Sequence, residues 1–176
     1  EKEFKLNIEQ NHAILAKHSF EHEIAYALSN DIFGSIDINR GDYLVGWDTD
    51  QFPNNVEELV LPFYYIFKNG GFSSGGLNMD AKIRRQSIDP EDLFYAHIGS
   101  MDTCARTLIA VEKMINDGGY ENFLKQRYEL WASEKQLMTS MSLEDIHKNV
   151  IAKNINPEPK SGRQEYLENL INSFVD

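Results

Sequence analysis

Two short segments, FKLNIE at residues 4–9 and GSIDINRGD at residues 34–42, determine the fold that the sequence predicts. The first segment alternates in part between apolar and polar side chains, which is typical of a strand, and it ends in the carboxylate of Glu9. The second segment predicts another short strand, which reaches Asp37 and then enters a glycine-containing loop. Each of these strands is therefore expected to end at or beside a carboxylate.

A third strand is predicted within GGLNMDAK at residues 75–82, and it ends near Asp80. Apolar residues at helical spacing separate the strands. The helices are expected to begin at Ser19, at Asn54 or Asn55, and at Asp89. The order strand–helix–strand–loop–helix–strand–helix predicts parallel βα units over residues 1–118 and therefore an α/β fold.

Residues 119–176 carry only helical patterns, and they predict a helical arm. Ser142 and Asp145 have the spacing of a capping box at a helix start. NINPEPKSG at residues 154–162 reads as a linker, and a last helix is expected over residues 163–174. The chain thus divides into a barrel-like portion and an arm.

Acidic side chains gather where the predicted strands end. Ligands in parallel α/β folds bind beyond the carboxyl ends of the strands. Converging carboxylates repel one another, and a hard divalent cation such as Mg²⁺ or Mn²⁺ relieves that repulsion, while a histidine ligand favours Mn²⁺ or Co²⁺. The candidate metal ligands are Glu9, His12, Asp37, Asp48, Asp50 and Asp80.

Each of these residues also has an ordinary interpretation. Asp48 and Asp50 suit a loop turn, and His12 suits a hydrogen-bonded surface histidine. The repetition at three successive strand ends favours the metal site. The remaining histidines are interpreted as background, with His97 packed on a helix and three others exposed: His18, His22 and His147. The Arg84–Arg85 pair suits a solvated turn or a contact with acidic groups of another subunit.

The net charge of −11, from 28 acidic and 17 basic residues, argues against a nucleic-acid partner, because such proteins carry a basic patch. No apolar run approaches the ~18 residues of a membrane span. The single cysteine, Cys104, is expected to be buried, and its isolation is typical of a cytoplasmic protein.

The chain resembles the xylose isomerase (glucose isomerase) family in five motifs that follow the family's order. They are NIEQNHA (7–13), GSIDINRGD (34–42), GWDTDQFPNN (46–55), GGLNMDAKIRRQS (75–87) and SGRQEYLENL (161–170). The resemblance covers nearly the whole chain, but it corresponds only to the C-terminal part of the family. It implies the last three βα units of a TIM (β/α)8 barrel followed by a helical arm, and a homotetramer in the full-length form.

The resemblance also implies residue roles. Glu9 would bridge two divalent metal ions. Both ions are expected to be Mg²⁺, with Mn²⁺ or Co²⁺ as the alternatives. Asp37 and Asp80 would bind the first ion. The second ion would be bound by His12, Asp48 and Asp50. His12 and Asp50 would be the catalytic residues.

The activity implied is an aldose–ketose isomerisation by a 1,2-hydride shift, of D-xylose to D-xylulose and of D-glucose to D-fructose. Asn39 and Arg40 would surround the metal ligands. Lys17 stands where the family usually has glycine, and Met79 where it usually has phenylalanine.

A closed barrel takes ~250 residues, so 176 residues with three strands cannot close one. The fragment is therefore expected to need the N-terminal part of the same barrel for activity. The alternative is an inactive truncated product that binds divalent metal or assembles through its arm. A different metal-dependent barrel enzyme, such as a phosphodiesterase, fits the charge and the motifs less well.

Overall fold

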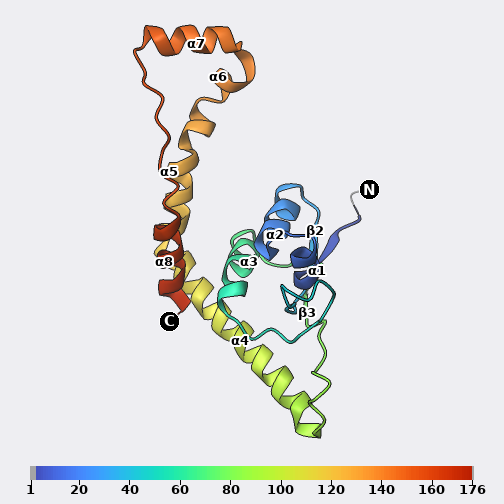
Figure 1. Ribbon diagram of the computed structural model, residues 1–176. Coiled ribbons are helices and arrows are strands. Elements are labelled where there is room, and N and C mark those ends of the chain that lie inside the picture. Colours follow the sequence, from blue (N-terminus) through green and yellow to red (C-terminus); the bar gives the residue numbers. More distant parts are fainter. Residues whose placement is uncertain (1–2, 176) are drawn as a thin grey trace. The chain divides into compact units, whose positions relative to one another are not determined.

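A computed structural model describes residues 3–175 (Figure 1). The chain forms two compact units. The first contains the residues up to Asn116 together with those from Asn172 onward, and the second contains Asp117–Ile171. Each unit is described by itself.

The first unit is built on a parallel sheet of three strands in the order β1–β2–β3. The strands are β1 (Leu6–Glu9), β2 (Phe33–Asp37) and β3 (Leu77–Asn78). The predicted α/β class with parallel strands is confirmed. The sheet is consistent with part of a barrel, whereas its assignment to the last three units of a TIM barrel stays a prediction.

The third strand is shorter than the segment 75–82 from which it was predicted. It pairs with β2 only through Leu77 and Asn78, and the chain leaves the sheet before it reaches Asp80. A β-carbon on Gly75 would lie 2.2 Å from the Gly34 carbonyl oxygen. The backbones of these segments therefore approach so closely that glycine is required there.

The helices of this unit that lie in its described part before Asn116 are α1 (Gln10–Leu15), α2 (Phe20–Ser29), α3 (Glu57–Lys68) and α4 (Pro90–Asp117). The last residue of α4, Asp117, belongs to the second unit. α2 packs on α3 and on the strands, and this packing forms the core (Figure 1). Its most buried apolar side chains are Ile24, Ala27, Ile36, Ile38, Leu59, Val60 and Ile66. The predicted burial of Cys104 is confirmed.

α3 begins later than its predicted start at Asn54 or Asn55. The Asn55 side chain accepts a hydrogen bond from the Glu57 backbone N–H at 3.0 Å, so it satisfies a free amide at the helix start. Pro62 lies inside α3, where it is buried and does not end the helix. The helix predicted from Asp89 is confirmed as α4.

The second unit is helical, as predicted. It contains α5 (Gly119–Ser133), α6 (Lys135–Ser140), α7 (Leu143–Ala152) and most of α8 (Gln164–Val175). The capping box is confirmed, because the Ser142 hydroxyl oxygen accepts from the Asp145 N–H at 3.1 Å. Within the described residues, no helix has the length and apolar character needed to cross a membrane.

Candidate metal centre

The sheet register brings the predicted first-metal ligands together. Glu9 is paired with Asp37 at the ends of β1 and β2, and Asp80 follows two residues after Asn78, the partner of Asp37 in β3. One carboxylate oxygen from each of Glu9, Asp37 and Asp80 lies within 4.8 Å of the others. The parallel strands thus deliver three carboxylates to one edge.

A second cluster contains Glu9, His12 and Asp48, whose ligand atoms also lie within 4.8 Å of one another. α1 starts directly after β1 and carries His12 back towards Glu9. The His12 ring faces a carboxylate at each nitrogen, with Nδ1 3.2 Å from Glu9 Oε2 and Nε2 3.0 Å from Asp48 Oδ2. Glu9 is the residue that the two clusters share.

Asp50 belongs to neither cluster but lies beside them, because Asn39 Nδ2, which donates to Glu9, also donates to Asp50 Oδ1 at 3.4 Å. Its Oδ2 atom forms an ion pair with Lys82 Nζ at 2.6 Å. Its backbone φ of 40° lies in the left-handed region, which few aspartates adopt. The role of Asp50 as a ligand and catalytic residue stays a prediction, and so do the roles of the other five residues.

Two pKa values in the clusters are shifted. Burial raises the pKa of Glu9 above 4.5, and a hydrogen bond from Asn39 only partly offsets this. Burial alone lowers the pKa of His12, but its hydrogen bond with Asp48 and the charge of Glu9 raise it above 6.5 overall. The protonated imidazolium, a donor at both nitrogens, is thus the form that suits two flanking carboxylates.

Amide side chains hold the carboxylates in place. Asn7 and Asn78 donate to the two oxygens of Asp37 at 2.6 and 3.1 Å. The fully buried Asn39 donates to Glu9 Oε1 at 2.7 Å and to the Asp80 carbonyl oxygen at 3.0 Å. These amides orient the carboxylates, and each carboxylate oxygen keeps a lone pair with which it can bind a cation.

Sequence analysis named Asn39 but missed the amides of Asn7 and Asn78, although the sequence contains a signal for them. Each strand end carries an asparagine and a carboxylate two residues apart: Asn7 and Glu9, Asp37 and Asn39, Asn78 and Asp80. Residues two apart on a strand point to the same face of the sheet. Asn11 was also missed. It is buried on α1, and its side chain donates to Asp48.

The donor sets fit divalent metal ions. One cluster offers carboxylate oxygens alone, and the other offers carboxylate oxygens and one imidazole nitrogen. Mg²⁺ prefers the first kind of set, and Mn²⁺ or Co²⁺ accepts the second. The repulsion expected among the carboxylates supplies the driving force for binding a cation.

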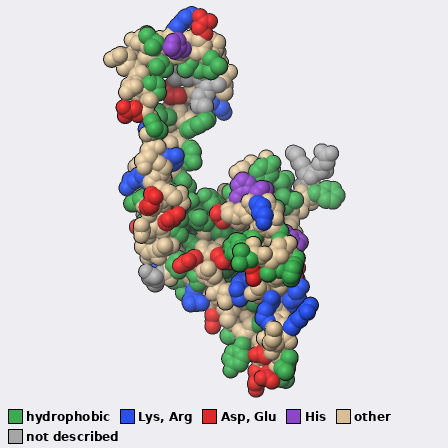
Figure 2. All heavy atoms as spheres, in the orientation of Figure 1, with side chains coloured by type: hydrophobic (Ala, Val, Ile, Leu, Met, Phe, Trp, Pro, Cys, Tyr) green, Lys and Arg blue, Asp and Glu red, His purple; other side chains and the backbone are tan. Residues whose placement is uncertain are grey.

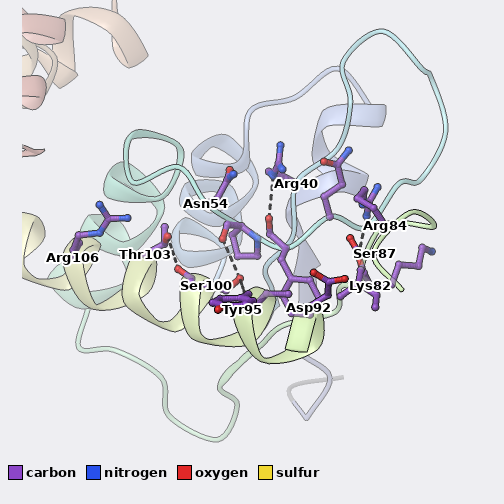
Figure 3. A pocket seen from close by; sticks show the side chains of 16 residues that line it. Arg40, Asn54, Lys82, Arg84, Ser87, Asp92, Tyr95, Ser100, Thr103 and Arg106 are labelled. Carbon is purple, nitrogen blue, oxygen red and sulfur yellow. Dashed lines mark hydrogen bonds between the residues drawn. The ribbon is translucent and has the colours of Figure 1, made fainter. Parts of the chain in front are cut away.

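A basic pocket of about 460 Å³ lies beside the loop that carries Asp48 and Asp50 (Figure 3). Arg40 Nε donates to the Phe52 carbonyl oxygen at 3.0 Å, and Arg84 donates to the Thr49 carbonyl oxygen at 3.0 Å. These two hydrogen bonds attach the backbone of the loop to the side chains of Arg40 and Arg84. Lys and Arg side chains gather on this part of the first unit (Figure 2).

The other histidines were predicted as background. His18, His22 and His147 are exposed, as predicted. His97 contacts the Phe52 ring with 4.7 Å between ring centroids, but its side chain is exposed. The contact with Phe52 agrees with the expected packing of His97 on its helix, and the exposure of the side chain shows that this packing covers only part of it.

The fold and the site together define an α/β protein with a carboxylate-rich edge at the ends of parallel strands. Comparison with known proteins indicates which members of this class the chain is similar to. The sequence model of the family described as "XylA2 C-terminal domain" matches residues 124–175. Proteins named xylose isomerase are similar along nearly all of the chain, with 60% identity in a Ruegeria species and 58% in Brucella canis and Brucella abortus.

These alignments include 99% of the chain but only 41% of each relative. The chain therefore spans about two fifths of the length of the curated relatives that it matches. The resemblance to the xylose isomerase family, in its C-terminal part, is confirmed.

Proposed function

We propose that this chain supplies ligands for two divalent metal ions of an aldose–ketose isomerase that acts on D-xylose and D-glucose. The observation that carries the proposal is the position of Glu9, which belongs to both ligand clusters. A carboxylate shared between two adjacent clusters suits a bridge between two cations. The similarity to proteins named xylose isomerase supports the choice of substrate class.

In this proposal Glu9, Asp37 and Asp80 hold the first ion, and Glu9, His12 and Asp48 hold the second, joined by Asp50 when it leaves Lys82. Bound ions would supply Lewis-acid polarisation of the oxygens on the two sugar carbons between which the hydride moves. Asn39 keeps Glu9 oriented, and Asn11 keeps Asp48 oriented. Asp50 would hold or transfer a proton beside the second set, and His12 would act as a catalytic residue by holding the second ion.

Residues 1–118 provide a portion of a TIM barrel in this proposal. The proposed activity needs the rest of the barrel, because an open sheet of three strands leaves unpaired edges and does not enclose a substrate. The test is an assay with D-xylose and Mg²⁺ or Mn²⁺. The chain alone should show no turnover, and mixing or co-expressing it with the remaining portion of the Ruegeria relative should restore turnover. Turnover by the chain alone would contradict the proposed need for further strands.

The ligand assignment is tested separately by calorimetric titration with Mn²⁺. His12→Ala and Asp37→Asn each remove a ligand of a different cluster, so each should weaken one binding step by roughly tenfold or more. Asp102→Asn, on the exposed face of α4, is the matched control. Unchanged Mn²⁺ binding in both ligand variants would refute the assignment.

A second candidate function is metal binding without catalysis. The observation in its favour is that both ligand clusters come from this chain, while the sheet formed by residues 3–175 has only three strands. Tight Mn²⁺ binding without turnover, even after the remaining portion is supplied, would support this alternative.

We further propose that residues 119–176 form an arm that assembles copies of the protein into a homotetramer. No residue of α7 or α8, all of which are described, is buried, and each helix has an apolar face. Leu143, Ile151 and Tyr166 are exposed. Light scattering tests this proposal, because a monomer in the full-length protein would contradict it.

A further inference from the structure

The basic pocket of about 460 Å³ has a charge opposite to that of the chain as a whole. Its lining includes four cations and one carboxylate, which leaves +3: Arg40, Lys82, Arg84, Arg106 and Asp92. Lys82 is neutralised by Asp50, so the arginines carry the remaining positive charge. The whole chain carries −11. A positive hollow on an acidic protein concentrates anions in one place.

Arg40 and Arg84 are held in position by backbone carbonyl groups instead of carboxylates. Arg40 donates from Nε to one carbonyl oxygen, and Arg84 donates from Nη2 alone to three carbonyl oxygens. In the part of the chain that the structure describes, the other N–H groups of these two side chains have no hydrogen-bond partner, and no arginine of the pocket forms an ion pair. The guanidinium groups are therefore fixed in place and keep N–H donors for a ligand.

The two guanidinium groups also lie close enough to repel each other. Burial lowers the pKa of Arg84 below its ordinary value, the charge of Arg40 lowers it further, and the charge of Asp50 partly offsets both. Neighbouring cations are stabilised by an anion between them, just as neighbouring carboxylates are stabilised by a cation. Arg84 also belongs to the Arg84–Arg85 pair, which the metal centre does not use.

The rest of the lining is polar and small in scale. Ser87 and Tyr95 offer hydroxyl groups and Asn54 offers an amide (Figure 3). In Figure 3 the labelled residues of α4, among them Tyr95, lie on the opposite side of the pocket from Arg40 and Arg84. A volume of about 460 Å³ is in the range of small-molecule sites, so it suits a small solute.

We infer that this pocket binds a small organic oxyanion, a free solute with carboxylate or phosphate groups, on the guanidinium groups of Arg40 and Arg84. A guanidinium group forms two parallel hydrogen bonds with a carboxylate or a phosphate, which fixes the anion in orientation as well as in position. This site goes beyond the proposed isomerase function, because the sugars of that reaction are uncharged and do not need arginine partners.

The experiment titrates the metal-free full-length protein with malonate in a calorimeter, with malonamide as the neutral analogue of similar shape. The protein is free of metal because malonate also binds divalent cations. Malonate should bind, and malonamide should bind at least about tenfold more weakly, because charge-assisted hydrogen bonds are roughly twice as strong as neutral ones. Raising the NaCl concentration from about 50 to about 200 mM should weaken malonate binding, because salt screens the charges.

Two pairs of variants test the residues. Arg84→Gln removes one guanidinium group and should weaken malonate binding by about tenfold. Arg85→Gln is its matched control, because Arg85 is the next residue and does not line the pocket. Asp92→Asn removes the carboxylate of the lining and should tighten malonate binding by about threefold. Asp102→Asn, on the exposed face of the same helix, should leave malonate binding unchanged.

Circular dichroism checks that each variant is folded, and the gain expected from Asp92→Asn tests the proposal even if Arg84→Gln does not fold. The proposal is overturned if malonate does not bind, if malonamide binds equally well, or if Arg84→Gln and Arg85→Gln behave alike. It is also overturned if Asp92→Asn binds malonate no more tightly than Asp102→Asn does.

Light scattering in the presence of malonate distinguishes a free solute from a protein partner. If malonate binds and the oligomeric state stays the same, the occupant is a free solute, as proposed. If malonate dissociates an oligomer, the natural occupant is an acidic side chain of a second copy, and the proposal of a small-molecule site is wrong.

Discussion

The Oδ2 atom of Asp50 forms an ion pair with the Lys82 ammonium group at 2.6 Å, and Asp50 belongs to neither cluster of ligand atoms at the strand ends. Burial raises the pKa of Asp50, but hydrogen bonds with Asp48 and Lys82 lower it below 3.8 overall. Asp50 is thus ionised, and its carboxylate is neutralised by Lys82 of the same chain. Lys82→Met should free this carboxylate and tighten Mn²⁺ binding by about fivefold, which is the effect expected of one exposed ion pair. Calorimetric titration with Mn²⁺ measures the change.

Two variants control this prediction. Lys160→Met removes an exposed lysine of the linker and should leave Mn²⁺ affinity unchanged. Adding Asp50→Asn to Lys82→Met should abolish the gain, because the freed carboxylate is then gone. If the single variant Lys82→Met binds Mn²⁺ no more tightly than the parent protein, Lys82 does not compete for Asp50.

His12 should stabilise the metal-free protein in a pH-dependent way. Its pKa in the folded protein is raised above 6.5, so its stabilising contribution is complete below pH 6.5 and is lost as pH rises through the raised pKa. His12→Gln should therefore lower the melting temperature by about 2 °C near pH ~6 and have little effect near pH ~9. Thermal unfolding with a chelator present, at both pH values, provides the measurement.

His147→Gln is the matched control, because His147 is exposed on α7 and lies outside both clusters. It should leave the melting temperature unchanged at either pH. A loss of stability in His12→Gln that is equal at both pH values would mean that His12 acts by packing and not as a cation between Glu9 and Asp48.

The sequence predicted the strand ends well, because alternation and terminal carboxylates are local features. Glu9 and Asp37 lie in register as the parallel βα interpretation requires. The short helix α1 and the two-residue length of β3 were not predicted. α1 has only six residues, too few for a periodic pattern, and the length of β3 depends on how many backbone bonds β2 offers to it.

The site was predicted only in part for the same physical reason. Glu9, Asp37 and Asp80 meet because the sheet aligns consecutive strand ends. The pairing of Asp50 with Lys82 joins residues 32 positions apart across two irregular segments, and no periodicity encodes such a contact. Loops are fixed by long-range bonds such as that of Arg84 to the Thr49 carbonyl oxygen, which appear only in three dimensions.

Asn39 should be a stabilising residue as well as an orienting one. It is fully buried, donates to Glu9 Oε1 at 2.7 Å and accepts from the Asn11 backbone N–H at 2.9 Å. Asn39→Ala removes both hydrogen bonds and leaves two buried or partly buried groups, the Glu9 carboxylate and the Asn11 N–H, without this partner. It should therefore lower the free energy of unfolding by about 2–3 kcal/mol. Urea unfolding measures the loss. Asn156→Ala, in the exposed linker, is the control, and an equal effect of the two variants would contradict the role of Asn39.

Lys17 holds a backbone conformation that favours glycine, with φ of 67°. The Lys17 N–H donates to the Ile14 carbonyl oxygen and the His18 N–H to the Ala13 carbonyl oxygen, both at 2.9 Å, which is the Schellman arrangement at the end of α1. A side chain in this region costs about 1–2 kcal/mol, and the greater freedom of glycine in the unfolded chain offsets part of that gain. Lys17→Gly should therefore raise the free energy of unfolding by about 1 kcal/mol in urea titrations. Gly70→Ala makes the opposite change at the matching position after α3, where φ is 96°, and should destabilise; a Lys17→Gly protein no more stable than its parent would refute the argument.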